Sequence, residues 1–107
     1  MTNHIEKNTT PKQYSMSGIN LSFKEVRMLA DNVAKNKSLI HLHISRKGIT
    51  DQGGVELAKM LIDNKTLTKL ELEGNLLENL SAAEFGKALR VNKTLRYLDL
   101  SNNNLTN

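Results

Sequence analysis

The sequence of 107 residues contains no cysteine, and only 4% of its residues are aromatic. Without cysteine, the chain can form neither a disulfide framework nor a thiolate metal site. No apolar run approaches the roughly 20 residues that a membrane-spanning helix needs, and the first residues, MTNHIEK, lack the apolar stretch of a secretory signal. We therefore expect a cytoplasmic protein without a membrane segment, and a core built mainly from aliphatic side chains.

The dominant feature of the sequence is a repeat with a period of 28 residues. An Asn-Lys-Ser/Thr-Leu tetrapeptide occurs three times, at 36–39, 64–67 and 92–95. Each copy leads into the pattern L-x-x-L-x-L/I, followed five residues later by Leu or Ile. The three segments read LIHLHISRKGI at 39–49, LTKLELEGNLL at 67–77 and LRYLDLSNNNL at 95–105. A degenerate copy, PKQYSMSGINL, precedes them at 11–21.

Each unit combines a short alternating segment with a longer segment of helical periodicity. Alternate apolar residues are expected to point inward from a strand: Leu42 and Ile44, Leu70 and Leu72, Leu98 and Leu100. The helical segments carry apolar or small residues at i, i+3, i+4 and i+7, at Val26, Leu29, Ala30 and Val33, at Gly54, Leu57, Ala58 and Leu61, and at Ala82, Phe85, Gly86 and Leu89. The pairs Ser22–Glu25 and Ser81–Glu84 fit the capping box that begins a helix. We expect Ala58 and Gly86 where a helix approaches the sheet most closely.

A single strand–turn–helix unit cannot bury its own apolar side, whereas stacked units share a continuous core. We therefore predict an α/β fold with one domain over residues 1–107 and a parallel sheet in which Leu42, Leu70 and Leu98 lie side by side. The predicted repeats cover about 8–35, 36–63 and 64–91, with a partial repeat at 92–107.

The repeated pattern resembles that of the leucine-rich repeat superfamily, in its ribonuclease-inhibitor-like class. The resemblance implies a right-handed solenoid of about three and a half repeats, with parallel strands on the concave face and helices on the convex face. It also implies that an Asn closes the turn after each strand. Asn75 and Asn103 match that position, whereas Lys47 and Ile19 replace the Asn in the earlier copies. We therefore expect a looser turn at the N-terminal end.

Leucine-rich repeats usually bind with the outward residues of the concave strands, so the resemblance predicts a non-catalytic protein–protein interaction module. Parallel pairing would place His43, Glu71 and Asp99 in one row. Tyr97 is the best aromatic anchor. The candidate partner-binding residues are His41, His43, Lys69, Glu71, Glu73, Tyr97 and Asp99. The repeat class includes tropomodulin-like actin regulators, innate immune receptors, ciliary proteins and bacterial effectors, and the sequence singles out none of them.

A second functional hypothesis concerns the ends of the chain, where no separate polar cap is visible. The sequence predicts either a fragment of a longer repeat array or ends that stack on a partner or on another copy. The alternative to concave-face binding is therefore a structural role. In that role the repeats would stack end to end, or would join a larger complex such as a cytoskeletal assembly.

Other classes of function are not expected. His41, His43 and Glu71 offer metal-ligand chemistry, but an open sheet face provides no second shell, and Lys69 would repel a cation, so we assign no metal and no cofactor. The sequence has no phosphate loop and no cysteine nucleophile, which disfavours an enzyme. The net charge of +4 comes mostly from helical segments that also carry acidic residues, without aromatic stacking partners, so nucleic-acid binding is not expected.

Overall fold

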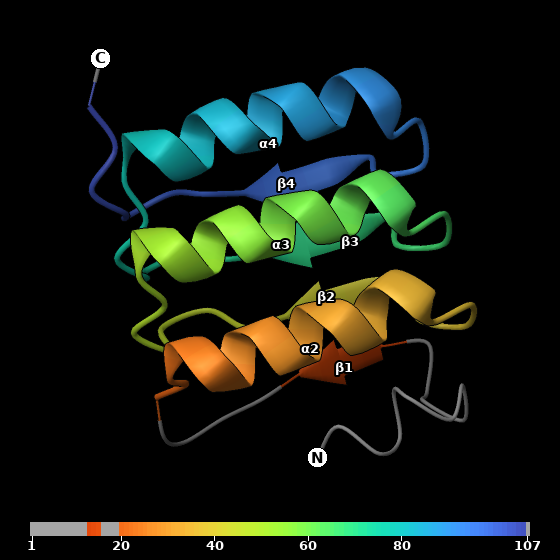
Figure 1. Cartoon of the computed structure of the whole chain (residues 1–107), viewed down its shortest axis with the longest axis horizontal. Helices are drawn as coiled ribbons and strands as arrows, with labels where there is room; N and C mark the ends of the chain where they lie inside the picture. The colour runs from red at the N-terminus through yellow and green to blue at the C-terminus, as the bar shows by residue number, and fades with distance from the viewer. Residues whose placement is uncertain (1–12, 16–19, 107) are drawn as a thin grey trace.

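The computed structural model describes residues 13–15 and 20–106. The first predicted repeat is therefore only partly covered, and Ile19 lies outside the described residues. Within this part, short strands alternate with helices (Figure 1): β1 (Gln13–Ser15), α2 (Phe23–Lys35), β2 (His41–His43), α3 (Asp51–Asp63), β3 (Lys69–Glu71), α4 (Asn79–Val91) and β4 (Tyr97–Asp99). None of the helices among these residues is long and apolar enough to cross a membrane.

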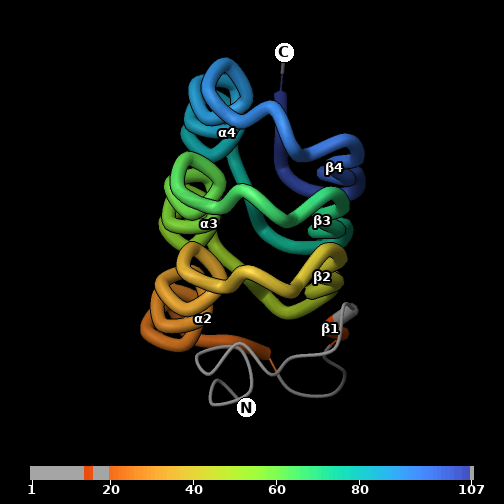
Figure 2. The backbone as a smooth tube through the Cα atoms, turned by 90° about the vertical axis from the view of Figure 1, so that its right-hand side faces the viewer, coloured from red at the N-terminus to blue at the C-terminus, as the bar shows by residue number. Residues whose placement is uncertain are grey.

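The strands form one parallel sheet in the order β1-β2-β3-β4, so each strand lies beside the strand of the preceding unit. Leu42 pairs with Leu70, and Leu70 pairs with Leu98. Figure 2 shows the strands in one layer and the three helices in a second layer, with α3 packed against both α2 and α4. The predicted solenoid and its row of leucines are confirmed.

The core lies between the sheet and the helix layer. Leu42, Leu70 and their neighbours Ile44 and Leu72 are fully buried, as the alternating pattern predicts. In the last strand the equivalent residues are only partly buried, since no further strand lies beyond β4 among the described residues. Burial of each aliphatic side chain contributes roughly 1.5–3 kcal/mol, so the middle units supply most of the apolar stabilisation.

The helical periodicity is confirmed in α2 and α3, whose predicted inward residues are all buried. It is only partly correct in α4, where Phe85 is buried but Gly86 and Leu89 are exposed. The reason is geometric, because α3 packs between α2 and α4, while among the described residues α4 has a helical neighbour on one side only.

One predicted helix start is confirmed and the other is wrong. The Ser22 hydroxyl accepts a hydrogen bond from the Glu25 N–H, and the Glu25 carboxylate accepts one from the Ser22 N–H. Helix α4 instead begins at Asn79, so Ser81 lies inside its first turn and is buried. The cap comes from the preceding helix: an Asp51 carboxylate oxygen accepts hydrogen bonds from the N–H groups of Glu78 and Ser81, both at 2.9 Å.

Among the described glycines, Gly54 has the tightest contact with the neighbouring repeat, and the expectation for Gly86 is wrong. A Cβ atom on Gly54 would lie 2.1 Å from the Ser81 Oγ and 2.6 Å from a Leu77 methyl carbon. The same atom on Gly86 would meet nothing within 4 Å. The contact at Gly54 joins α3 to the start of α4, so glycine is required where one helix meets the next repeat.

The asparagine ladder after the strands follows the family pattern. The Asn75 carboxamide oxygen accepts hydrogen bonds from Lys47 and Ile49, and its NH₂ group donates to Ile44 and Leu72. Asn103 repeats this arrangement one unit later, toward Leu72, Leu77 and Leu100. Each amide therefore joins its own turn to the turn of the preceding repeat. The expected looseness of the first turn stays a prediction.

A second asparagine ladder follows the helices. In the sequence its members define the 28-residue repeat, but their contacts were not predicted. Its members are Asn36, Asn64 and Asn92, all buried. The Asn64 oxygen accepts from Thr66 and Leu67 in its own turn, while its NH₂ group donates to the Val33 carbonyl of the preceding repeat at 2.8 Å. Asn92 makes the equivalent bonds to Thr94, Leu95 and Leu61. Both connections of the repeat that contains β3 are thus fixed by asparagine amides, Asn64 and Asn75.

Candidate functional site on the strand face

The outward side chains of the strands form one continuous surface, which we call the strand face. Strand pairing places His41, Lys69 and Tyr97 in one row. The parallel row holds His43, Glu71 and Asp99. Glu73 follows β3 on the same side, because successive strand side chains alternate. The structure therefore brings together all seven residues that the sequence analysis selected, and their role in binding stays a prediction.

The centre of the strand face is a diagonal contact between His41 and Glu71. The His41 Nε2 atom hydrogen-bonds to a Glu71 carboxylate oxygen across the two strands. This hydrogen bond, assisted by the nearby positive charge of Lys69 and opposed by partial burial, holds the pKa of Glu71 below its usual value. The His41 and His43 rings stack with their centroids 6.4 Å apart. The Glu71 side chain is therefore ionised and held in place at neutral pH.

Tyr97 presents an exposed aromatic ring at the edge of the strand face. Its exposed fraction is 49%, and the Lys69 ammonium lies 5.0 Å from the ring centroid, within the range of a cation–π contact. The Asp99 carboxylate raises the pKa of the Tyr97 hydroxyl, with smaller contributions from Glu71 and Glu73. The ring therefore keeps its hydroxyl proton and combines an apolar surface with a hydrogen-bond donor.

Two residues outside the predicted set also take part in this surface. Arg46 reaches Glu73 from the turn after β2, with 3.3 Å between the Nη2 and Oε2 atoms. Ser101 donates two hydrogen bonds to Asp99, from its hydroxyl and its N–H, and these lower the pKa of the Asp99 carboxyl. The repeat spacing places Ser101 among the outward positions, but it does not show the hydrogen bonds from Ser101 to Asp99. Arg46 was not predicted, because it lies in a turn with a left-handed backbone.

Metal-ligating atoms converge at the acidic end of the strand face. One imidazole nitrogen of His43 and one carboxylate oxygen each from Glu71 and Glu73 lie within 4.8 Å of one another. In the sequence, His41, His43 and Glu71 were the candidate ligands for such a site. The structure instead engages His41 with Glu71 and supplies Glu73 as the third converging group.

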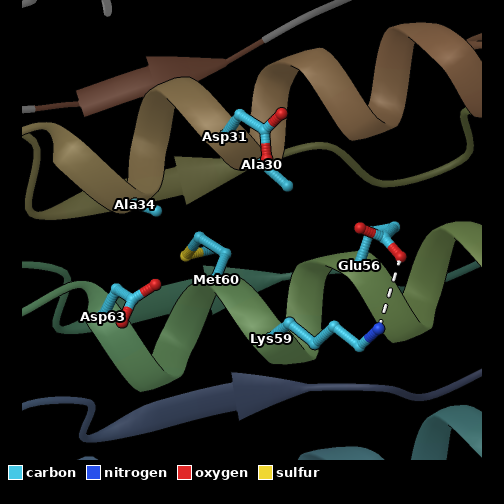
Figure 3. Close-up of a pocket in the computed structure, with 7 residues that line it drawn as sticks. All are labelled: Ala30, Asp31, Ala34, Glu56, Lys59, Met60 and Asp63. Atoms are coloured by element: carbon cyan, nitrogen blue, oxygen red, sulfur yellow. Dashed lines mark ion pairs between the residues drawn. The ribbon is translucent and has the colours of Figure 1, made fainter.

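A small hollow lies on the opposite, helical side of the molecule, between α2 and α3 (Figure 3). It measures about 170 Å³, and Glu56 and Lys59 form an ion pair at its rim, 3.8 Å apart. Its lining residues are Ala30, Asp31, Ala34, Glu56, Lys59, Met60 and Asp63. Because this hollow is small and its ion pair is partly exposed to solvent, the strand face is the stronger candidate site.

Comparisons with known proteins agree with this architecture. A family model described as "Leucine Rich repeat" matches residues 35–58 and 91–107. The tropomodulin C-terminal domain of Caenorhabditis elegans superposes with a TM-score of 0.83 at 18% identity, over 95% of this chain and 62% of that chain. A structure described as "Leiomodin-1 Actin-Binding Site 2 (ABS2)" superposes with a TM-score of 0.83 at 20% identity, over 97% of this chain and 60% of that chain.

This chain thus spans about three fifths of the length of each of those two structures. A search of curated protein sequences gave no match. At these identities the superpositions establish the fold, and the family model independently matches two segments of the repeated pattern. The chain therefore has the leucine-rich repeat fold, with the strand–turn–helix unit of 28 residues that is consistent with the ribonuclease-inhibitor-like class.

Proposed function

We propose that this protein is a non-catalytic interaction module that binds a protein partner through the strand face. The observation that carries the proposal is the exposed Tyr97 ring, set beside ordered charged groups on neighbouring strands. Aromatic residues surrounded by polar contacts dominate the binding energy of many protein interfaces. The parallel register supports the proposal, because it fixes the spacing of these side chains before any partner arrives.

The charge of the strand face suggests the chemistry of the partner. Glu71, Glu73 and Asp99 gather acidic charge along β3 and β4, and Lys69 is engaged with Tyr97. A partner segment that offers Lys or Arg side chains would complement this surface and would associate faster at low salt. Since one structure of the same fold is described as an actin-binding site, actin is the first partner to test.

The test compares strand-face variants with a variant of the helical side. Y97A is expected to weaken binding to actin by roughly 30-fold or more, the loss expected of a hot-spot residue. E71Q is expected to weaken it less, and R90A on α4 should bind like the unchanged chain. Binding is measured by co-sedimentation with filaments and by titration of labelled monomeric actin. Loss of binding in R90A, with Y97A and E71Q unaffected, would place the interface on the helices instead.

A specific observation also favours the alternative role in assembly. The outer side of the last described repeat exposes Leu89, Val91 and Leu105, and leaves Leu98 and Leu100 only partly buried. A second solenoid that stacks there would extend the sheet by strand addition and would cover these side chains. Analytical ultracentrifugation across a wide concentration range tests this function. A concentration-dependent dimer that V91E abolishes would support it, and a monomer throughout would refute it.

A further inference from the structure

We propose that the strand face binds a zinc ion through His43, Glu71 and Glu73. The proposal rests on geometry, because one ligand atom from each residue lies within 4.8 Å of the other two. His43 and Glu71 lie on neighbouring strands in a register fixed by backbone pairing, and Glu73 directly follows β3, held by the backbone bond from Arg46. These residues also belong to the proposed partner-binding surface, but the ligand set itself lies within one chain and needs no partner residue.

The donor set is the first argument for zinc. One imidazole nitrogen and two carboxylate oxygens are among the ligands that Zn²⁺ takes in proteins, and sites with three protein ligands keep one position open. Calcium and magnesium instead prefer sets made entirely of oxygen ligands, usually six or more. The strand face should therefore select zinc over these two cations.

The separation of the ligand atoms is close to what a zinc ion needs. With metal–ligand bonds of about 2.1 Å, the ligands of a tetrahedral zinc ion lie about 3.4 Å apart. Side chains that now lie within 4.8 Å must each move by less than about 1 Å to close around the ion. Because all three are only half-buried, rotation of their side chains can supply this movement without any shift of the backbone.

A second shell, whose absence was the main sequence-based argument against a metal, is present around Glu71. The His41 imidazole hydrogen-bonds to the Glu71 carboxylate, which is the type of outer contact that orients metal ligands. Arg46 pairs with Glu73 at 3.3 Å and competes with a cation. The Arg46 side chain is 71% exposed, however, and an exposed ion pair of this kind is weak enough to be displaced.

An unpartnered hydroxyl on Ser45, the next outward position after His43 and in register with Glu73, provides independent support. Ser45 follows His43 on the outward side of the chain. The backbone bonds from Ile44 to Glu71 and from Arg46 to Glu73 continue the strand register past it. Among the described residues, the Ser45 Oγ is a buried side-chain oxygen without a hydrogen-bond partner. Buried hydroxyls normally have a partner, and a water molecule in the open position of the zinc ion would provide one.

The experiment titrates the full chain with zinc chloride by isothermal titration calorimetry at pH 7.5. We expect one zinc ion per chain, and a loss of affinity of at least 10-fold in each of H43Q and E73Q. H41Q should weaken binding by a smaller factor, since His41 acts through Glu71. E84Q, on the helical side, is the matched control and should bind like the unchanged chain. Circular dichroism of each variant verifies that the fold is retained.

Cobalt provides a second readout that does not depend on affinity. Replacement of zinc by Co²⁺ should give visible absorption bands whose intensity reports a coordination number of four or five, and these bands should disappear in H43Q. Calcium chloride should give no heat of binding. Equal zinc affinity in the unchanged chain, H43Q and E73Q would overturn the proposal and would identify an adventitious ion only.

Discussion

Single asparagine side chains hold neighbouring repeats together in this protein. Asn64 and Asn75 each join their own turn to the turn of the repeat before it, so two ladders of amides run along the solenoid. The family resemblance predicted the ladder at Asn75, because that position belongs to the known pattern. The ladder at Asn64 was not predicted, because the partner of its NH₂ group lies 31 positions earlier in the chain and repetition alone does not reveal a contact.

Truncation of Asn64 should therefore be costly. N64A would remove the partners of the Leu67 N–H and the Val33 carbonyl in a fully buried position, and each buried group left unsatisfied costs about 1–3 kcal/mol. We expect the free energy of unfolding to fall by about 2–4 kcal/mol in urea denaturation. The exposed Asn104 provides the control, since N104A should change it by less than about 0.5 kcal/mol. Equal effects of the two variants would contradict the role of the ladder.

At the scale of whole elements, the packing of α3 against α4 determines whether a helical glycine can be replaced by a larger residue. Gly54 and Gly86 lie in helices where alanine has the higher intrinsic propensity, by about 1 kcal/mol. Sequence periodicity assigned tight packing to Gly86, because it aligns with the buried Ala58. The structure reverses that assignment, since the outer neighbour that would crowd Gly86 is absent from the described residues.

The two glycines should respond to alanine in opposite directions. G54A would push a methyl group into Ser81 and Leu77, and we expect a net loss of stability of about 1–3 kcal/mol, as for other overpacked sites. G86A should raise stability by about 0.5–1 kcal/mol, because its methyl group meets open space. Thermal and urea unfolding of both variants measures the difference. Destabilisation by G86A would show that the outer side of α4 is covered in solution.

The start of α4 depends on the carboxylate of Asp51, which belongs to the preceding helix. D51A should lower the free energy of unfolding by about 1 kcal/mol, as expected for the loss of a helix cap. The matched control is D31A on the exposed side of α2, which should change stability by less than about 0.5 kcal/mol. Equal losses in the two variants would mean that the contacts to Glu78 and Ser81 contribute nothing to stability.

The contribution of the Asp51 carboxylate to stability should also depend on pH. Partial burial raises the pKa of Asp51, but hydrogen bonds from Ser81, Glu78 and Leu80 outweigh it, so the pKa is lower in the folded protein than in the unfolded chain. This contribution to stability is therefore fully present above the unfolded value of about 3.9 and is lost as the pH falls through the folded pKa. The D51N variant has no ionisable group at this position and therefore lacks this contribution. The difference in the free energy of unfolding between the unchanged chain and D51N should therefore shrink between pH 5 and pH 2. A difference that stays constant would argue against the lowered pKa.

At the scale of the whole molecule, the 28-residue period was sufficient to predict the layers, the strand order and the rows of the strand face. Each of these follows from stacking identical units in register, and the pairing of Leu42, Leu70 and Leu98 confirms it. The details of the strand face could not be predicted in this way. The diagonal bond from His41 to Glu71 and the reach of Arg46 to Glu73 depend on side-chain directions, whereas the period fixes only the backbone.

Leu70 and Leu98 occupy equivalent positions in the repeat, but their places in the sheet should make their contributions to stability different. Leu70 is fully buried between two strands, whereas Leu98 is only partly buried on the outer strand β4. We expect L70A to cost about 2–5 kcal/mol, the usual loss for a buried leucine, and L98A to cost roughly half as much. Urea unfolding at low protein concentration measures both variants. If L98A costs as much as L70A, a second surface must cover the outer edge of β4 in solution, which would favour the assembly role.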